Sequence, residues 1–171
     1  MSAAVIASAT SRITAEYVNP VIAATRTVFS TMLGATANRT GLSLRTEAAL
    51  SSGTSSGVSA VIGISGQAAG TLVLNLTTST AIEVLRRLIG TEARDVNAEV
   101  CDAVGEITNM IAGHAKAQLA KYSLSISIPN VVSGADHTVH FPSNVIPMVL
   151  SFDSDLGPFT IEVGFSNLPV G

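Results

Sequence analysis

The stretch Cys101–Lys116, CDAVGEITNMIAGHAK, predicts an amphipathic helix that anchors the fold. Its apolar side chains recur every three or four residues, so they share one side of a helix with 3.6 residues per turn. The core-facing positions are Val100, Val104, Ile107, Ile111 and Ala115. We therefore expect this helix to pack on a hydrophobic core, with its opposite side turned outward.

The outward side of this helix carries Asp102, Glu106, Asn109 and Gly113, which lie within about 60° of one another. We refer to these four residues as the polar stripe. A merely solvated helix face is usually filled with good helix formers, whereas Gly105 and Gly113 each cost about 1 kcal/mol relative to Ala. The composition indicates close approach of another surface. Simple solvation of an amphipathic helix is the alternative interpretation.

Length and composition indicate one domain with a sizeable core. The 171 residues are 47% hydrophobic, yet no run approaches the about 18 apolar residues that would cross a bilayer. We assign residues 1–14 to an N-terminal segment without fixed structure and residues 15–171 to a single domain. The start MSAAVIASATSR lacks the basic residues of a signal peptide, so we expect a cytoplasmic protein.

Charge and cysteine content exclude several classes of partner. The formal net charge is −3, so no basic surface is available to neutralise nucleic acid or anionic lipid. Cys101 is the only cysteine and cannot form an internal disulfide. His137 and His140 are three apart in a segment that we expect to be a strand, hence on opposite faces, so we expect no metal site.

The order of the expected elements predicts an α+β fold with long helices on a largely antiparallel sheet of about six strands. Helices are expected over Tyr17–Leu33, Thr80–Ile89 and from Asn97 to about Tyr122. Three strands are expected after the first helix, over Leu42–Leu50, Val58–Ser65 and Gly70–Leu76. Three or four are expected after the long helix, over Leu124–Val132, Thr138–Phe141, Ile146–Phe152 and Phe159–Phe165. The segments GTLVLNL (70–76) and GPFTIEV (157–163) occupy equivalent places, which indicates a coarse internal duplication.

A second Glu-x-x-Asn spacing occurs before the first long helix, at Glu16 and Asn19. Pro20 places Asn19 at the start of that helix, where its side chain is expected to cap the backbone. We therefore expect this copy to be structural.

The polar stripe also carries a family resemblance. Asp102-x-x-x-Glu106-x-x-Asn109 is similar to the D/S-x-x-x-E-x-x-N signature of the CheC/CheX/FliY chemotaxis phosphatases, and the chain most resembles the CheX members. The likeness spans about residues 15 to 167 and includes these blocks in order: NPVIAATRTVFSTMLG (19–34), VIGISGQAAGTLVLNL (61–76), NMIAG (109–113) and PNVVSG (129–134).

The resemblance implies a CheC-like pseudo-repeat and an enzyme that hydrolyses the aspartyl phosphate of a CheY-like response regulator. It assigns Asn109 to orienting the attacking water and Glu106 to pairing with a lysine of the regulator. Asp102, Gly105 and Gly113 become candidate partner-binding residues. No cofactor is expected on this chain, and Mg²⁺ is expected on the regulator. The resemblance also implies a homodimer joined through its sheets.

Two other functions remain open from the sequence. One is a non-catalytic module that binds receivers, of the flagellar-switch type; the other is a purely structural domain. The presence of both Glu106 and Asn109 favours the enzyme, because a binding module has no need of the amide.

Overall fold

The computed structural model describes residues 14–45 and 55–167, so most of the expected N-terminal segment 1–14 lies outside the described residues. A π-helical turn, Thr14–Val18, leads into α2 (Asn19–Leu33). The other α-helices are α4 (Thr78–Ile89) and α5 (Ala98–Gln118), followed by a 3₁₀ turn, Ala120–Tyr122. The strands are β1 (Ala37–Leu44), β2 (Ser55–Ser65), β3 (Ala69–Thr77), β4 (Ser125–Ile126), β5 (Asn130–His137), β6 (Met148–Ser154) and β7 (Phe159–Asn167).

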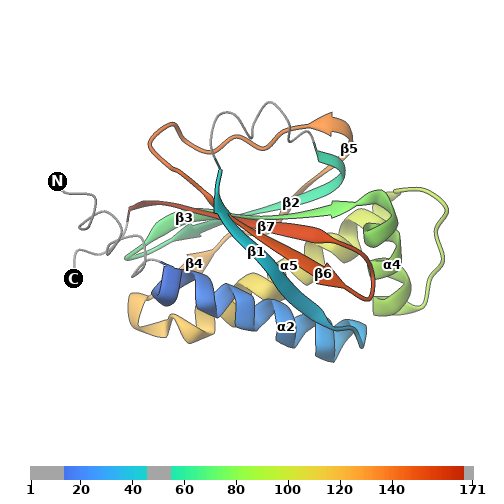
Figure 1. Ribbon diagram of the computed structural model, residues 1–171, viewed down its shortest axis with the longest axis horizontal. Coiled ribbons are helices and arrows are strands. Elements are labelled where there is room, and N and C mark those ends of the chain that lie inside the picture. Colours follow the sequence, from blue (N-terminus) through green and yellow to red (C-terminus); the bar gives the residue numbers. More distant parts are fainter. Residues whose placement is uncertain (1–13, 46–54, 168–171) are drawn as a thin grey trace.

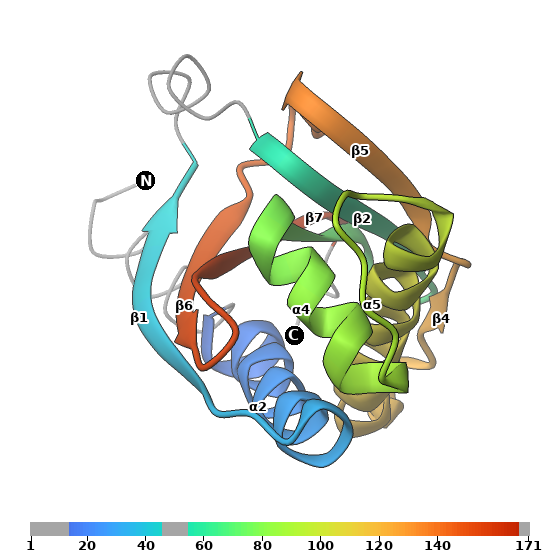
Figure 2. The same cartoon turned by 90° about the vertical axis from the view of Figure 1, so that its right-hand side faces the viewer.

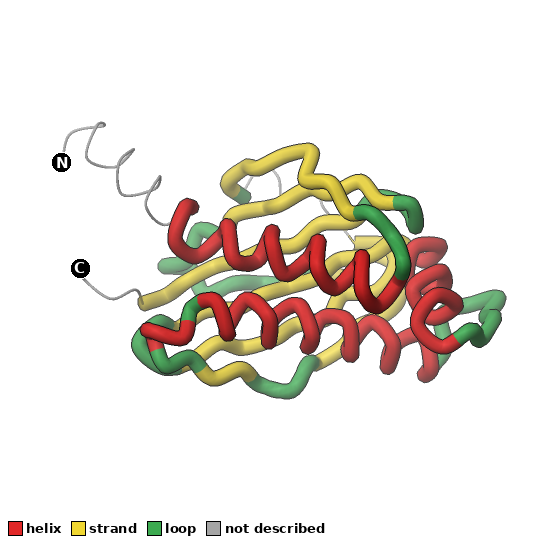
Figure 3. Tube along the Cα trace, turned by 90° about the horizontal axis from the view of Figure 1, so that it is seen from below, coloured by secondary structure: helices red, strands yellow, loops and turns green. Residues whose placement is uncertain are grey.

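The described strands form one seven-stranded antiparallel sheet whose helices cover a single face (Figure 1). Its order is β1-β6-β7-β3-β2-β4, and β5 pairs with another part of β2. Figure 3 shows α2 and α5 running side by side beneath the strands, with α4 at one end. This arrangement confirms the predicted α+β class, and its seven strands compare with a predicted total of about six.

The sheet order reveals how the two halves of the chain interlock. At the centre, β3 and β7 pair with each other; β3 contains the segment GTLVLNL, and β7 contains all of the similar segment GPFTIEV except its first two residues. The strand after α2, β1, pairs with β6 of the second half, whereas β5, the first long strand after α5, pairs with β2 of the first half. Each half thus completes the sheet of the other, and α2 and α5 occupy related positions.

The core lies between the helices and the sheet. Every core-facing residue predicted on α5 is buried, with at most 5% of its surface exposed. These side chains pack with Leu72, Leu74 and Leu76 of β3 and with Phe29 of α2 in one cluster. Phe29 stacks on Phe159 at a ring distance of 4.7 Å. The predicted amphipathicity of α5 is confirmed.

Local signals fix the ends of the helices that carry the outward face. The side chain of Asn97 accepts a hydrogen bond from the Val100 amide at 3.0 Å, which confirms the predicted start of α5. Gly90 adopts φ 74° and its amide donates to Arg86 O at 2.9 Å, which ends α4 at the predicted residue, Ile89. The N-cap of α4 is Thr77, whose hydroxyl accepts a hydrogen bond from the Thr80 amide at 3.2 Å.

Three strand predictions were inaccurate. β1 begins at Ala37 and not at Leu42, because six of its eight side chains are exposed and residues 37–41 leave no apolar alternation. The predicted strand 124–132 is split into β4 and β5, since Pro129 has no amide proton to extend a ladder. Residues 138–141 are not a strand.

The chain leaves the sheet before residue 138 because Asp136 adopts φ 57°, and the His137 ring forms a hydrogen bond with Gly134 O at 3.1 Å. His140 therefore lies in a connection rather than on a strand, and the predicted opposite orientation of two strand histidines is wrong. Within the described residues, no helix is long and apolar enough to cross a membrane.

Candidate functional site

Helix α5 presents the predicted polar stripe on its outer side. Asp102 and Glu106 are exposed, whereas Asn109 and Gly113 are half-buried. From Asp102 to Gly113 the stripe is about 16 Å long, and Glu106 and Asn109 lie within one turn of each other. The structure therefore brings the two predicted catalytic side chains together on one accessible surface.

The polar groups of the stripe are available to a partner. Within residues 14–45 and 55–167, Asp102, Glu106 and Asn109 make no hydrogen bond or ion pair. On neighbouring α4, by contrast, Glu83 accepts hydrogen bonds from Arg86 and Arg87, which lower its pKa to about 2. The stripe thus combines free carboxylates with a free amide that can accept and donate hydrogen bonds.

The two glycines predicted to contact a partner have different surroundings. A Cβ on Gly105 would lie 3.3 Å from Val131 Cγ2 and 3.5 Å from Pro129 Cγ, so Gly105 is buried where α5 approaches β5. A Cβ on Gly113 would have no atom within 4 Å. Packing accounts for Gly105, whereas Gly113 leaves open space on the stripe itself.

The first Glu-x-x-Asn has another geometry. Glu16 lies in the π-helical turn, where it accepts a 2.6 Å hydrogen bond from Lys121 Nζ and another from the Tyr122 hydroxyl. Asn19 is the exposed first residue of α2, and the N-cap is Val18, without a side-chain hydrogen bond. The predicted capping by Asn19 is therefore wrong, because the π-helical turn already carries the backbone into α2.

The helix-free face of the sheet carries a polar network that the sequence did not reveal. Ser59 Oγ lies 2.6 Å from Asn75 Oδ1 and 2.7 Å from the His137 ring. Asn75 donates to Glu162 Oε1 at 3.0 Å, and Arg45 donates to Glu162 Oε2 at 2.5 Å. Since these side chains satisfy one another, the network stabilises the pairing of distant strands.

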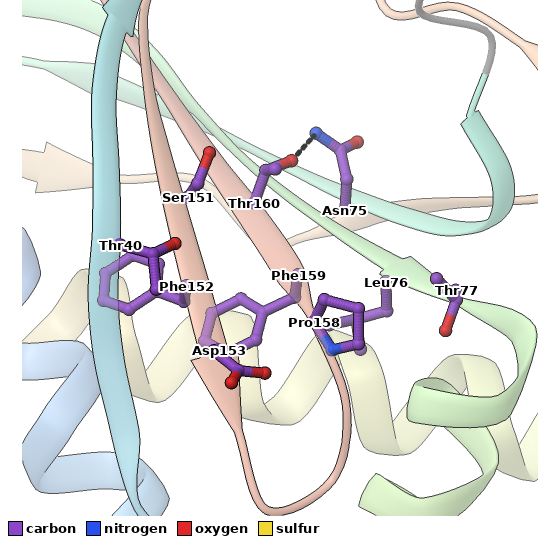
Figure 4. A pocket seen from close by; sticks show the side chains of 10 residues that line it. All are labelled: Thr40, Asn75, Leu76, Thr77, Ser151, Phe152, Asp153, Pro158, Phe159 and Thr160. Atoms are coloured by element: carbon purple, nitrogen blue, oxygen red, sulfur yellow. Dashed lines mark hydrogen bonds between the residues drawn. The ribbon is translucent and has the colours of Figure 1, made fainter.

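Two hollows flank these surfaces. A cavity of about 570 Å³ lies on the helix-free face between β1, β3, β6 and β7, where Asn75 donates to Thr160 Oγ1 at 3.2 Å (Figure 4). A groove of about 270 Å³ lies between α4 and α5 and is lined by Asp102 and Glu106. The smaller hollow is the one next to the candidate site.

Among the described residues, no three His, Cys, Asp or Glu side chains are grouped so that they could hold a metal ion. Asn109 can orient a water, and the carboxylates can attract and pair with a cation. The chemistry that this surface can perform on its own is therefore positioning and charge recognition.

Comparisons with known proteins agree with this arrangement. The family "Chemotaxis phosphatase CheX" matches residues 58–153, more than half of the chain and all of α5. A putative chemotaxis protein from Desulfovibrio vulgaris Hildenborough is 34% identical, with a TM-score of 0.75 over 88% of this chain and 97% of that chain. Chemotaxis protein CheX from Vibrio vulnificus is 30% identical, with a TM-score of 0.77 over 88% and 97% of the two chains.

A more distant structure shares the fold. The CheX–CheY–BeF3–Mg²⁺ complex from Borrelia burgdorferi contains a chain that is 20% identical, with a TM-score of 0.67 over 87% of this chain and 97% of that chain. No curated protein matches the sequence significantly. The family match and the two closer structures lead to one conclusion: this chain belongs to the CheX family of chemotaxis phosphatases.

Proposed function

We propose that this protein accelerates hydrolysis of the aspartyl phosphate on a CheY-like response regulator. The observation that carries the proposal is the position of Glu106 and Asn109, unpaired within the described residues and one turn apart on the outer side of α5. Membership of the CheX family and the complex of a Borrelia relative with CheY support the same substrate class. We expect the reaction to take place in the cytoplasm.

Asn109 is the proposed positioning group for the attacking water. An acyl phosphate is already activated, so its hydrolysis needs a water in line with the phosphorus and stabilisation of the charge on the phosphoryl oxygens. The amide oxygen of Asn109 accepts a hydrogen bond from that water. The water oxygen then bonds to phosphorus, the bond to the aspartyl oxygen breaks, and free phosphate and an aspartate carboxylate result. No covalent intermediate on this chain is needed.

Glu106 is the proposed docking group. A carboxylate one turn from Asn109 can form a charge-assisted hydrogen bond with the lysine that response regulators place beside their phosphorylation site. Asp102 lies one turn further toward the start of α5, where its negative charge attracts the same basic surface. The Mg²⁺ that neutralises the phosphoryl oxygens belongs to the regulator. This chain supplies only the helix face.

The test is the lifetime of a phosphorylated CheY-type receiver in Mg²⁺ buffer with and without this protein. The wild-type protein should shorten the lifetime. The Asn109→Ala variant should turn over more slowly even when the phosphorylated receiver is saturating. The Glu106→Ala variant should need a higher concentration of receiver to reach its half-maximal rate. Absence of acceleration by wild type, or wild-type behaviour of both variants, would contradict the proposal.

A non-catalytic receiver-binding module remains the second candidate, because the same exposed carboxylates would serve docking alone. Binding of an activated receiver without any shortening of its phosphate lifetime would favour this candidate over the enzyme.

We also propose a homodimer. The outer strand β1 exposes Leu42 and Leu44, by 42% and 49%, at a sheet edge that a second copy could cover. Light scattering at micromolar concentration should report a dimer, and a monomer would contradict this assignment.

A further inference from the structure

The groove between α4 and α5 adjoins the polar stripe but has a different lining. Leu88, Ile89 and Ala103 form its apolar part, and Glu99, Asp102 and Glu106 supply carboxylates at its rim. Figure 2 shows α4 crossing in front of α5, so that the end of one helix lies beside the first half of the other. Because Asp102 and Glu106 belong to the stripe and also line this groove, the two surfaces are continuous.

Ile89 is the feature of the groove that solvation does not explain. It is 61% exposed, although it is the last residue of a helix whose inner side chains Val84 and Leu85 are fully buried. Gly90 ends α4 directly after it through a left-handed cap, so Ile89 lies in the last turn of the helix. Ile89 does not stand alone, because it lines the groove together with Leu88 and Ala103, and exposed apolar side chains that are grouped and rimmed by polar ones are typical of a contact surface.

The charges at the rim restrict what can bind there. Glu99, Asp102 and Glu106 make no ion pair within the described residues, whereas the nearby Glu83 of α4 is neutralised by Arg86 and Arg87. An occupant must therefore bring an apolar side chain together with positive charge. Since Asp102 and Glu106 belong to both surfaces, one partner can engage the stripe and the groove together.

We propose that this groove is a second contact for the same response regulator and takes an apolar side chain that is flanked by Lys or Arg on the regulator's surface. The inference rests on the proposed function and adds the feature that selects among receivers. The groove contributes to binding and leaves the chemical step to Asn109. Receivers whose surface lacks an apolar side chain flanked by Lys or Arg should be poorer substrates.

The test uses Ile89→Lys with Ile146→Lys as its matched control. A lysine in the last turn suits the helix dipole, so α4 should still fold. Ile146 is 68% exposed but precedes β6, away from the groove. Circular dichroism melting should confirm that both variants are folded.

Against a phosphorylated receiver, Ile89→Lys should raise KM by about tenfold or more and leave kcat within about twofold. Ile146→Lys should change neither. Unchanged KM for Ile89→Lys, an equal rise for Ile146→Lys, or a loss confined to kcat would overturn the proposal.

The rim charge is tested separately with Glu99→Gln, which lies outside the Glu-x-x-Asn signature. KM should rise by roughly threefold at low salt, and the difference should disappear in high salt, because exposed charges are screened. An unchanged KM at low salt would overturn the charge part of the proposal.

Failure of the proposed function is distinguishable from failure of this inference. If wild type does not hydrolyse the phosphate, binding of a beryllofluoride-activated receiver still compares wild type with Ile89→Lys. Weaker binding of the variant would then support the groove without catalysis. Equal binding by both, or none by wild type, would overturn it.

Discussion

The spacing Glu-x-x-Asn occurs twice in this chain, and the two copies differ in backbone and in surroundings. At Glu106 and Asn109 both side chains share the outer side of a regular α-helix, and neither makes a hydrogen bond or ion pair with another described residue. At Glu16 and Asn19 the spacing runs from a π-helical turn into α2, and the carboxylate is bound by Lys121 and Tyr122. Identical spacing therefore gives an available site in one half and a structural contact in the other.

The first Glu is occupied because of how the chain halves interlock. Lys121 and Tyr122 lie in the 3₁₀ turn after α5, so the end of the helix that carries the candidate site closes over the other copy. Tyr17 stacks on Tyr122 at a ring distance of 5.2 Å and holds this contact in place. The comparison teaches that the contacts around each copy, rather than the sequence pattern, decide which copy is available to a binding partner.

The largest expected difference between the copies is in turnover. Asn109→Ala should lower kcat toward a phosphorylated receiver by about 100-fold, because the attacking water loses its orienting acceptor. Asn19→Ala, its matched control, should leave kcat unchanged. Single-turnover assays at saturating protein measure both. Equal losses in the two variants would remove the distinction between the copies.

The next difference is in binding. Glu106→Gln should raise KM by about tenfold, which corresponds to about 1.4 kcal/mol of lost charge pairing with the receiver. Glu16→Gln should leave KM unchanged and instead lower the melting temperature slightly, since it weakens the contact with Lys121. Titration of receiver and thermal melting separate these effects. A KM defect in Glu16→Gln would indicate that both surfaces bind.

The two glycines of α5 offer a smaller effect. Gly113→Ala should raise the free energy of unfolding by about 0.5–1 kcal/mol, because Ala favours the helix and no neighbour is displaced. It should also raise KM several-fold, because the new methyl group lies on the stripe. The Gly105→Ala variant should gain less free energy of unfolding, because its new Cβ would lie only 3.3 Å from Val131 Cγ2. Equal stabilisation of both variants would contradict the difference in packing.

The smallest effect concerns Glu83, a paired acid like Glu16. Hydrogen bonds from Arg86 and Arg87 lower the pKa of Glu83 from 4.5 to about 2. Its contribution to stability is therefore complete above pH 4.5 and is lost as the pH falls toward 2. Glu83→Gln should cost less than about 1 kcal/mol at pH 7, because the pair is on the surface, and much less at pH 2, where about half of the Glu83 carboxyl groups are protonated. Urea unfolding at several pH values checks this; a constant difference would contradict it.

The sequence predicted those parts of the fold in which periodicity and capping agree. In α5 the apolar positions and Asn97 both mark the same helix, and the structure confirms each. The failures have a physical cause in contacts between distant residues. Neither the exposed first half of the edge strand β1 nor the left-handed backbone at Asp136 leaves an amphipathic pattern.

For the candidate site, too, the sequence predicted the local geometry but not the contacts between distant residues. Regular helical geometry placed Asp102, Glu106 and Asn109 on one face, as the structure has them. The hydrogen bond from Lys121 to Glu16 could not be predicted, because it joins residues that are 105 positions apart in the sequence. Nor could the groove at Ile89, which depends on how α4 crosses α5.

The most direct test of the account is a crystal structure of this protein with a beryllofluoride-activated CheY-type receiver and Mg²⁺. The account predicts that α5 faces the activated aspartate, with the Asn109 amide within hydrogen-bonding distance of the in-line water and Glu106 paired with the receiver's lysine. A complex that docks through Glu16 and Asn19, or through the helix-free face of the sheet, would contradict it.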